Sequence, residues 1–305
     1  MEKINLFNEL FLSEFLVNLE FDKESPILSS DFPSFAIRGS IMYKAKKLLC
    51  VNKTHFNNCN ECMLSRKCIY ATLFETQRPH DAAIMRKYRN IPHPFVISVY
   101  PFSRVTTLRI VLFGEYINLF PYFYLVLKSL EKEKKFNIKS IKNFDRPILK
   151  SNKLMTNFKV RSSKEFENLT PEKTELLISI LTPIRMKYNG KLVNQTNMRF
   201  HHIIRNLLRR FSLLFYFYGS GPWNIDFSNF IKLAEGIEFK SAKLKWVELE
   251  RYSIRTKTFE PMGGVVGEIE LPERAIEFFP ILKLGEYTQV GKNTSFGLGF
   301  YKLNF

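Results

Sequence analysis

The run Gly291-Lys292-Asn293-Thr294-Ser295-Phe296-Gly297-Leu298-Gly299-Phe300 lies close to the C-terminal end of the chain, after a shorter run, Gly263-Gly264-Val265-Val266-Gly267. Six of the thirteen glycines fall in these two runs. Glycine permits positive φ and a close approach of backbone to ligand, and the longer run combines it with lysine and small polar residues. This composition predicts a backbone-lined loop that contacts phosphate. An ordinary hairpin whose glycines satisfy turn geometry is the alternative.

The charge balance indicates the class of partner. The chain has 46 Lys+Arg against 29 Asp+Glu, a formal net charge of +17. Such an excess is typical of proteins that bind nucleic acid, although general use of lysine on solvated faces explains part of it. No apolar run approaches the ~18 residues that span a bilayer, and no secretory signal pattern is found, so a cytoplasmic protein is expected.

Hydrophobic periodicity predicts the same order of elements twice. In the first half, a strand, a helix, two strands, a helix and a strand are expected at residues 11–21, 34–49, 95–100, 104–113, 117–131 and 158–166. In the second half, the same order is expected at residues 175–188, 197–218, 242–254, 264–271, 273–283 and 300–305. The repeat is the split βαβ pattern of tandem ferredoxin-like domains. We therefore predict an α+β fold with domains at residues 1–168 and 169–305.

Four cysteines form a second signal, in an insertion expected at residues 50–94. Cys50, Cys59, Cys62 and Cys68 are separated by eight, two and five residues. Four soft ligands at short range fit a tetrahedral zinc ion, and they do not resemble a secreted disulfide framework. An iron–sulfur cluster uses the same ligands, and cysteines without a metal are the remaining alternative. A zinc ion bound by four thiolates has no open position for water, so we expect it to be structural.

Several motifs occur in an order that resembles one family. They are residues 181–185, the basic segment 200–210, Trp246, Arg251 to Ser253, residues 263–268 and the run 291–300, which we call the glycine loop. A looser match lies at residues 35–39. In this order they resemble the CRISPR repeat-processing endoribonucleases of the RAMP superfamily. The resemblance implies two ferredoxin-like (RRM-like) domains. It also implies a metal-independent ribonuclease that cuts the repeats of a long CRISPR transcript, the pre-crRNA, into guide RNAs.

Cleavage by attack of a 2′-hydroxyl needs a base, an acid and cations around the phosphate, and histidine can serve either proton role near neutral pH. His201 and His202 open an amphipathic segment, residues 198–211. Its helical period places His202, Arg205 and Arg209 on the polar face. These two histidines are candidate catalytic residues. A solvated helix face with an incidental histidine is the alternative.

The first predicted helix is the rival site. In the resembled family the general base is often a histidine on this helix, but residues 37–47 contain none. Tyr43 and Lys47, with Lys44 beside them, are the candidates to orient the hydroxyl and stabilise charge. The sequence leaves open which residue is the base.

RNA binding is expected mainly at phosphates, which position the strand without reading its sequence. The candidate residues are basic side chains and the glycine loop: Lys44, Arg205, Arg209, Arg251, Lys292, Asn293, Thr294, Ser295, Gly291, Gly297 and Gly299. The expected partners are repeat RNA and subunits of a CRISPR effector complex. One alternative is a non-catalytic RAMP subunit that binds crRNA in such a complex. Another is a zinc-stabilised RNA-binding module outside CRISPR biology.

Overall fold

The computed structural model describes residues 6–52, 59, 61–88, 90–253 and 257–304. The chain divides into two units. The N-terminal unit comprises Ser13–Phe95 and Val99–Lys159, and the C-terminal unit comprises the chain from Val160 onward with the residues before Ser13 and Val96–Ser98. The break therefore falls earlier than the predicted boundary at residue 168. The physical reason is pairing: Ser163 donates its backbone N–H to the Leu10 carbonyl, and its Oγ accepts the Leu10 N–H, each at 2.9 Å.

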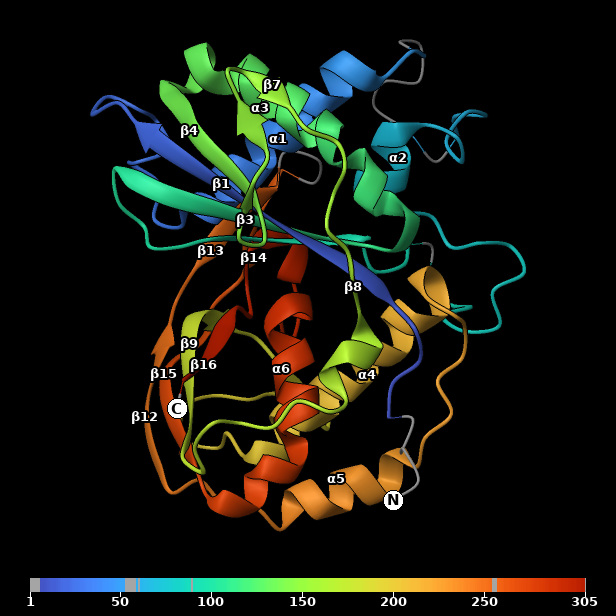
Figure 1. Cartoon of the computed structure of the whole chain (residues 1–305), viewed down its shortest axis with the longest axis vertical. Coiled ribbons are helices and arrows are strands. Elements are labelled where there is room, and N and C mark those ends of the chain that lie inside the picture. The colour runs from blue at the N-terminus through green and yellow to red at the C-terminus, as the bar shows by residue number, and fades with distance from the viewer. Residues whose placement is uncertain (1–5, 53–58, 60, 89, 254–256, 305) are drawn as a thin grey trace. The chain divides into compact units, whose positions relative to one another are not determined.

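The N-terminal unit has the predicted ferredoxin-like topology. Its main strands are paired in the order β2-β3-β1-β4, and the short β5 extends this sheet beyond β4. Helices α1 and α3 lie on one face of the sheet in Figure 1. The bounds are β1 Phe11–Phe21, α1 Pro33–Leu49, α2 Ile69–Phe74, β2 Phe95–Val99, β3 Val105–Phe113, η1 Gly114–Leu119, α3 Phe120–Lys134, β4 Phe136–Asn143, β5 Arg146–Pro147, β6 Leu149–Lys150 and β7 Lys153–Leu154.

One predicted strand of this unit is wrong. The closing strand was expected at residues 158–166, but β4 closes the sheet instead. A register shift opposite Asn18 and Leu19, between Ile138 and Ser140, interrupts the alternation of apolar residues in β4. Residues 158–166 contain only the short strand β8 (Arg161–Ser162) and the 3-10 turn η2 (Ser163–Phe166).

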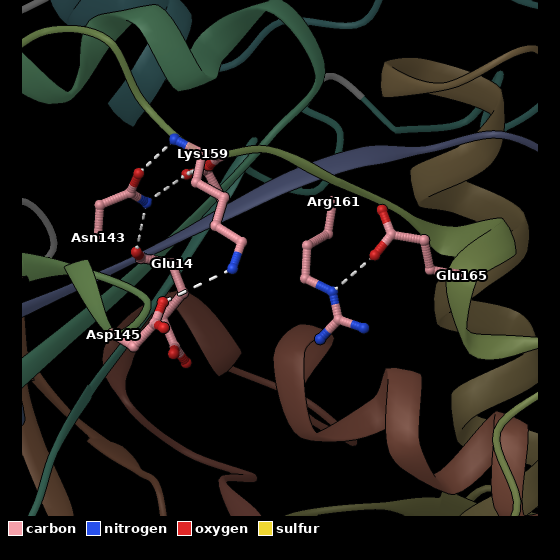
Figure 2. Close-up of polar contacts among 7 residues, drawn as sticks. Glu14, Asn143, Asp145, Lys159, Arg161 and Glu165 are labelled. Carbon is pink, nitrogen blue, oxygen red and sulfur yellow. Dashed lines mark hydrogen bonds and ion pairs between the residues drawn. The ribbon is translucent and has the colours of Figure 1, made fainter.

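A fully buried asparagine fixes the chain that follows this sheet (Figure 2). The Asn143 amide donates to the Ser13 hydroxyl and the Glu14 carbonyl, each at 2.9 Å, and its oxygen accepts the Lys159 N–H at 2.5 Å. Buried polar groups cost free energy unless they are paired, so the three bonds specify one position for this segment. In the same figure Lys159 also reaches Asp145, at 3.6 Å.

The C-terminal unit repeats the topology, with strands in the order β12-β15-β9-β16. Helices α4 and α6 pack against each other, and Figure 1 shows them on one face of this sheet. The bounds are β9 Leu176–Ile184, β10 Lys187–Tyr188, β11 Lys191–Leu192, α4 Phe200–Tyr218, α5 Phe227–Glu235, β12 Ser241–Val247, β13 Glu250–Ser253, β14 Thr258–Pro261, β15 Gly264–Leu271, η3 Glu273–Phe278, α6 Phe279–Thr288, η4 Thr294–Phe296 and β16 Tyr301–Asn304.

Two tandem ferredoxin-like units are thus confirmed, with differences in detail. The expected strand at residues 242–254 is two strands, β12 and β13, and the latter pairs with β14 in a separate hairpin. The expected strand at residues 175–188 ends at Ile184, before the hairpin of β10 and β11. Two predicted strand ends, Ile254 and Phe305, lie outside the described residues. In the described part of the chain, no helix has the length and apolarity to cross a membrane.

Candidate nucleic-acid interface

The glycine loop lies between α6 and β16 and packs on the end of β9. Lys292 donates its backbone N–H to the Arg185 carbonyl at 2.8 Å, and Gly299 donates to the Pro183 carbonyl at 2.9 Å. Gly299 has φ +80°, and a Cβ there would lie 2.0 Å from the Val290 carbonyl oxygen, so no other residue fits. Backbone contacts therefore hold the loop in one conformation.

The loop's polar side chains do not all face solvent, which corrects one expectation. Thr294 and Ser295 are buried, and the Asn293 amide lies 3.1 Å from the Met262 sulfur. They are turned inward because Asn293, at φ +61°, starts a tight 3-10 turn. Gly297 and Gly299 are buried as well. Of the polar side chains predicted to bind phosphate here, Lys292 is the exposed one.

Lys292 belongs to a group of four cations, which we call the basic cluster: Arg185, Lys187, Arg209 and Lys292. Burial lowers the pKa of Lys292, and the charges of the other three lower it further. Among the described residues, none of the four forms an ion pair with a carboxylate. The sequence pointed to Arg209 and Lys292, but it missed Arg185 and Lys187. Arg185 lies in the 181–185 motif and could have been found there.

Like charges that crowd one another without carboxylates raise the free energy of the folded protein. Three of the cluster's side chains are exposed, and Arg185 is half-buried with a guanidinium N–H donated to the Gly263 carbonyl at 2.7 Å. An arrangement of this kind is favoured when a polyanion supplies the missing negative charge. The basic cluster is therefore a candidate site for phosphate groups.

The structure places His202 differently from the prediction of a polar helix face. Its side chain is 6% exposed, and its Nδ1 accepts the backbone N–H of Arg199 at 3.2 Å, so the imidazole caps the start of α4. Burial, together with the nearby positive charges, lowers the pKa of His202 to about 4. At neutral pH this imidazole is uncharged, and one of its nitrogens is already occupied.

His201 is half-buried, and burial also lowers its pKa. Its Nε2 is buried and has no hydrogen-bond partner among the described residues. Both imidazoles contact Tyr188, with ring centroids 5.4 Å from His201 and 4.7 Å from His202. The histidine pair is therefore largely covered by the β10–β11 hairpin, while Arg205 and Arg209 remain exposed as predicted.

Arg251 has partners that the sequence did not reveal. Its guanidinium lies 2.5 Å from Glu260, across the β13–β14 hairpin, and 4.4 Å from the centroid of the Phe296 ring in the glycine loop. The hairpin also carries two exposed aromatic rings, Tyr252 and Phe259, with centroids 5.2 Å apart. Because its charge is compensated, Arg251 fits a role in joining the hairpin to the loop.

On α1, in the N-terminal unit, Tyr43 and Lys47 form one pair. Tyr43 is 49% exposed, and the Lys47 ammonium lies 4.4 Å from the centroid of its ring. A hydrogen bond to Tyr43 raises the pKa of Lys47. Lys44, the residue that follows Tyr43, instead forms an ion pair with Glu133 on α3, with Nζ and Oε2 3.1 Å apart. Lys44 and Lys47 therefore have different partners.

The four cysteines are free and half-buried. Cys50 donates its thiol to the Asn52 carbonyl at 3.3 Å, and the Asn52 amide lies 3.6 Å from the Cys62 sulfur. Burial raises the pKa of Cys59, and Cys68 and Cys50 are close enough to contribute. Nevertheless, the described residues include no group of three or more Cys, His, Asp or Glu that could hold a metal ion. The predicted metal site stays a prediction.

Comparison with known proteins gives the same division of the chain. Residues 12–160 match the family model of an AF_1859 N-terminal domain, and residues 178–301 match that of the CRISPR-associated endoribonuclease Cas6. Within residues 178–301 the chain is therefore similar to the Cas6 type of CRISPR-associated endoribonuclease. The Cas6 match begins in β9 and ends in β16, so it includes the glycine loop and all four residues of the basic cluster. No curated protein matches the chain.

Solved Cas6 structures share the fold. Cas6 of Thermus thermophilus (TTHB231) is 15% identical with a TM-score of 0.57, over 97% of this chain and 99% of that one. A product complex of Cas6 (TTHA0078) is 15% identical with a TM-score of 0.55, over 97% and 100%. A partial Cas6-RT-Cas1–Cas2 complex is 12% identical with a TM-score of 0.57, over 98% of this chain and 46% of that one. At these identities the likeness concerns the fold alone.

Proposed function

We propose that this chain is a Cas6-type endoribonuclease that cuts CRISPR repeat RNA by attack of a 2′-hydroxyl on the adjacent phosphate, without a catalytic metal. The 2′-oxygen loses its proton and forms a bond to phosphorus. The bond from phosphorus to the 5′-oxygen of the next nucleotide breaks, and that oxygen takes up a proton. The products are an RNA ending in a 2′,3′-cyclic phosphate and an RNA beginning with a 5′-hydroxyl.

The observation that carries the RNA-binding part is the basic cluster. Its four cations are next to a rigid loop and have no ion pair among the described residues, so a phosphate backbone would compensate them. Phosphate contacts position an RNA without reading it. We therefore assign the cluster to substrate binding, and we assign base recognition to other groups.

For the chemical step we propose the pair on α1. Tyr43 presents an exposed phenol, and Lys47 is protonated at neutral pH, with a contact to Tyr43 that raises its pKa further. A protonated lysine can stabilise the negative charge that develops on the phosphate oxygens, and the phenol can hydrogen-bond the attacking hydroxyl. His202 is less suited, since its Nδ1 caps α4 and its pKa is lowered to about 4.

The first experiment is incubation of the purified full-length chain with a labelled CRISPR repeat RNA in EDTA. A matched RNA carries one 2′-deoxy substitution at the cut site. One unique cut, lost with the deoxy substitution, is the expected result. Cutting that requires added metal would overturn the metal-independent mechanism. Tight binding without any cut would instead support the non-catalytic, crRNA-holding role.

Variants then locate the chemistry. Tyr43→Phe and Lys47→Gln are expected to slow cleavage by about 10²-fold at saturating protein, the scale of a lost proton-transfer or charge-stabilising group. Lys139→Gln is the matched control, because this exposed lysine of the same unit pairs with Glu20 at 2.7 Å. If both α1 variants cut at the wild-type rate and His201→Ala does not, the catalytic group belongs to α4.

Two further assignments are part of the proposal. Cas6 appears in a complex with RT, Cas1 and Cas2 among the similar structures, and we propose that this chain also associates with other CRISPR proteins. A structural zinc ion at Cys50, Cys59, Cys62 and Cys68 rests on their spacing and half-burial. Metal analysis of purified protein should find one zinc per chain, absent from Cys59→Ser with Cys62→Ser. A metal-free wild-type protein would exclude it.

A further inference from the structure

A small hairpin carries Lys187 of the basic cluster, and its other residues have no role in the proposed function so far. Strands β10 and β11 pair Lys187 with Leu192 and Tyr188 with Lys191. The tip residues Asn189 and Gly190 have φ +48° and +80°. Positive φ at both central residues is the signature of the type I′ turn, whose twist matches the strands. Residues 186–193 are therefore a compact arm of defined geometry.

Tyr188 attaches this arm to the first turn of α4. Its ring contacts both His201 and His202, and the Arg205 guanidinium lies 5.6 Å from its centroid. Cation–π contact of a guanidinium with an aromatic ring is favourable. The His202 imidazole, which also contacts the Tyr188 ring, is uncharged at neutral pH and so does not repel the guanidinium. The ring is occupied by these contacts, so it anchors the arm and is not a platform for a stacked base.

The two lysines of the arm, Lys187 and Lys191, are exposed. Among the described residues, neither Lys187 nor Lys191 forms an ion pair. Lys187 is close enough to Lys292 to lower its pKa. The arm thus extends the positive surface of the basic cluster beyond the glycine loop, from an element with no exposed aromatic ring to contact a base.

We propose that residues 186–193 extend the RNA-backbone contact of the basic cluster, in that Lys191, outside the cluster, and Lys187 each bind a phosphate and Tyr188 is the positioning residue. The inference rests on the proposed function, since it takes repeat RNA as the ligand. It adds that this contact is independent of sequence. A scrambled RNA of equal length should lose as much affinity as the repeat when the arm is neutralised.

The test is RNA binding by the full-length double variant Lys187→Gln with Lys191→Gln. Dissociation constants are measured by fluorescence anisotropy from 50 to 300 mM KCl. Each lost phosphate contact lowers the slope of log K against log salt by about 0.7–0.9, so two should lower it by about 1.4–1.8. Affinity at 100 mM KCl should fall roughly tenfold, equally for repeat and scrambled RNA.

The matched control is Lys243→Gln with Lys302→Gln. These lysines are exposed on the sheet of the same unit, across from Glu268 and Ser179, and their loss changes the net charge equally. A wild-type slope in the arm variant, or an equal drop in the control, would overturn the proposal. Because the readout is binding, a wild-type protein that binds RNA without cutting it would refute the proposed chemistry and leave this test intact.

Tyr188 is tested separately. Tyr188→Ala should lower the salt slope as the lysine double variant does, because the arm loses its anchor, and Tyr188→Phe should restore it, because the ring contacts need no hydroxyl. A role in stability alone would lower the melting temperature and leave the slope unchanged. That outcome would overturn the positioning role of Tyr188.

Discussion

The cations of the two units are used differently. In the N-terminal unit, basic side chains lie against carboxylates: Arg109 with Glu14, Lys44 with Glu133, Lys135 with Glu24 and Lys139 with Glu20. In the C-terminal unit, the basic cluster has no described carboxylate partner, and its charges lower the pKa of Lys292. Net charge alone does not locate a polyanion site. The proposed polyanion site rests instead on uncompensated charge around a rigid loop.

The largest expected effect is a loss of stability when one ion pair of the N-terminal unit is broken. Arg109 and Glu14 are both largely buried, with Nε and Oε1 2.5 Å apart. Glu14→Gln leaves a buried guanidinium without its carboxylate, and such a loss costs about 3 kcal/mol of unfolding free energy. Urea denaturation measures it. Asp145→Asn is the control, because its exposed pair with Lys159 should contribute less than about 1 kcal/mol. Equal effects would show that burial does not distinguish the pairs.

The next largest effect is a loss of RNA affinity when two cations of the basic cluster are neutralised. Arg209→Gln with Lys292→Gln should weaken binding of repeat RNA about 30-fold at 100 mM KCl, or about 2 kcal/mol, because two phosphate contacts are lost. Gel-shift titration measures it. Lys135→Gln with Lys139→Gln removes the same charge from paired residues, and its affinity should stay within about threefold. If both variants lose affinity equally, net charge alone governs binding and the comparison fails.

The fold could be predicted from the sequence because the same order of strands and helices occurs in both halves of the chain. A repeated order of strands and helices is informative even when one strand is misplaced, as β4 was because a register shift interrupts its alternation. Short elements carry too few residues for periodicity, so the β10–β11 hairpin was missed even though Asn189-Gly190 is a strong turn signal. That signal could have been found.

The site was predicted less completely, for a physical reason. Helical spacing placed His202 beside Arg205 and Arg209, which is correct for the backbone. It could not show that a hairpin from elsewhere in the chain covers the imidazole, or that the ring turns back to cap α4. Likewise, the composition of the glycine loop gave no sign that Thr294 and Ser295 point inward. Burial of a polar side chain depends on distant contacts that a local pattern does not contain.

A third prediction follows from the buried imidazole, which sits among uncompensated charges. The pKa of His202 is about 4 in the folded chain and near 6.5 when unfolded, so the unfolded state binds more protons between these values. The contribution is present above pH 6.5 and is lost as the pH falls toward 4, by on the order of 1–2 kcal/mol. Melting temperatures between pH 4 and 7 measure it. His202→Gln keeps an acceptor for the cap but does not titrate, and it should flatten the profile. An unchanged profile in this variant would assign the pH dependence to other groups.

The smallest effect tests whether the basic cluster is strained in the absence of RNA. Lys292→Gln removes one of four mutually repelling charges, so the free protein should become more stable by a few tenths of a kcal/mol, while its affinity for RNA falls. Opposite signs for stability and binding identify a residue kept for its ligand. The control is Lys302→Gln, at an exposed lysine on β16, and it should change neither the stability nor the RNA affinity by a comparable amount.

Chemical denaturation at low salt gives the clearest measurement of this stability change, since screening weakens the repulsion as ionic strength rises. If Lys292→Gln destabilised the free protein, the lysine would be holding the glycine loop together, and the contrast between paired and unpaired cations would no longer distinguish structure from function at this position.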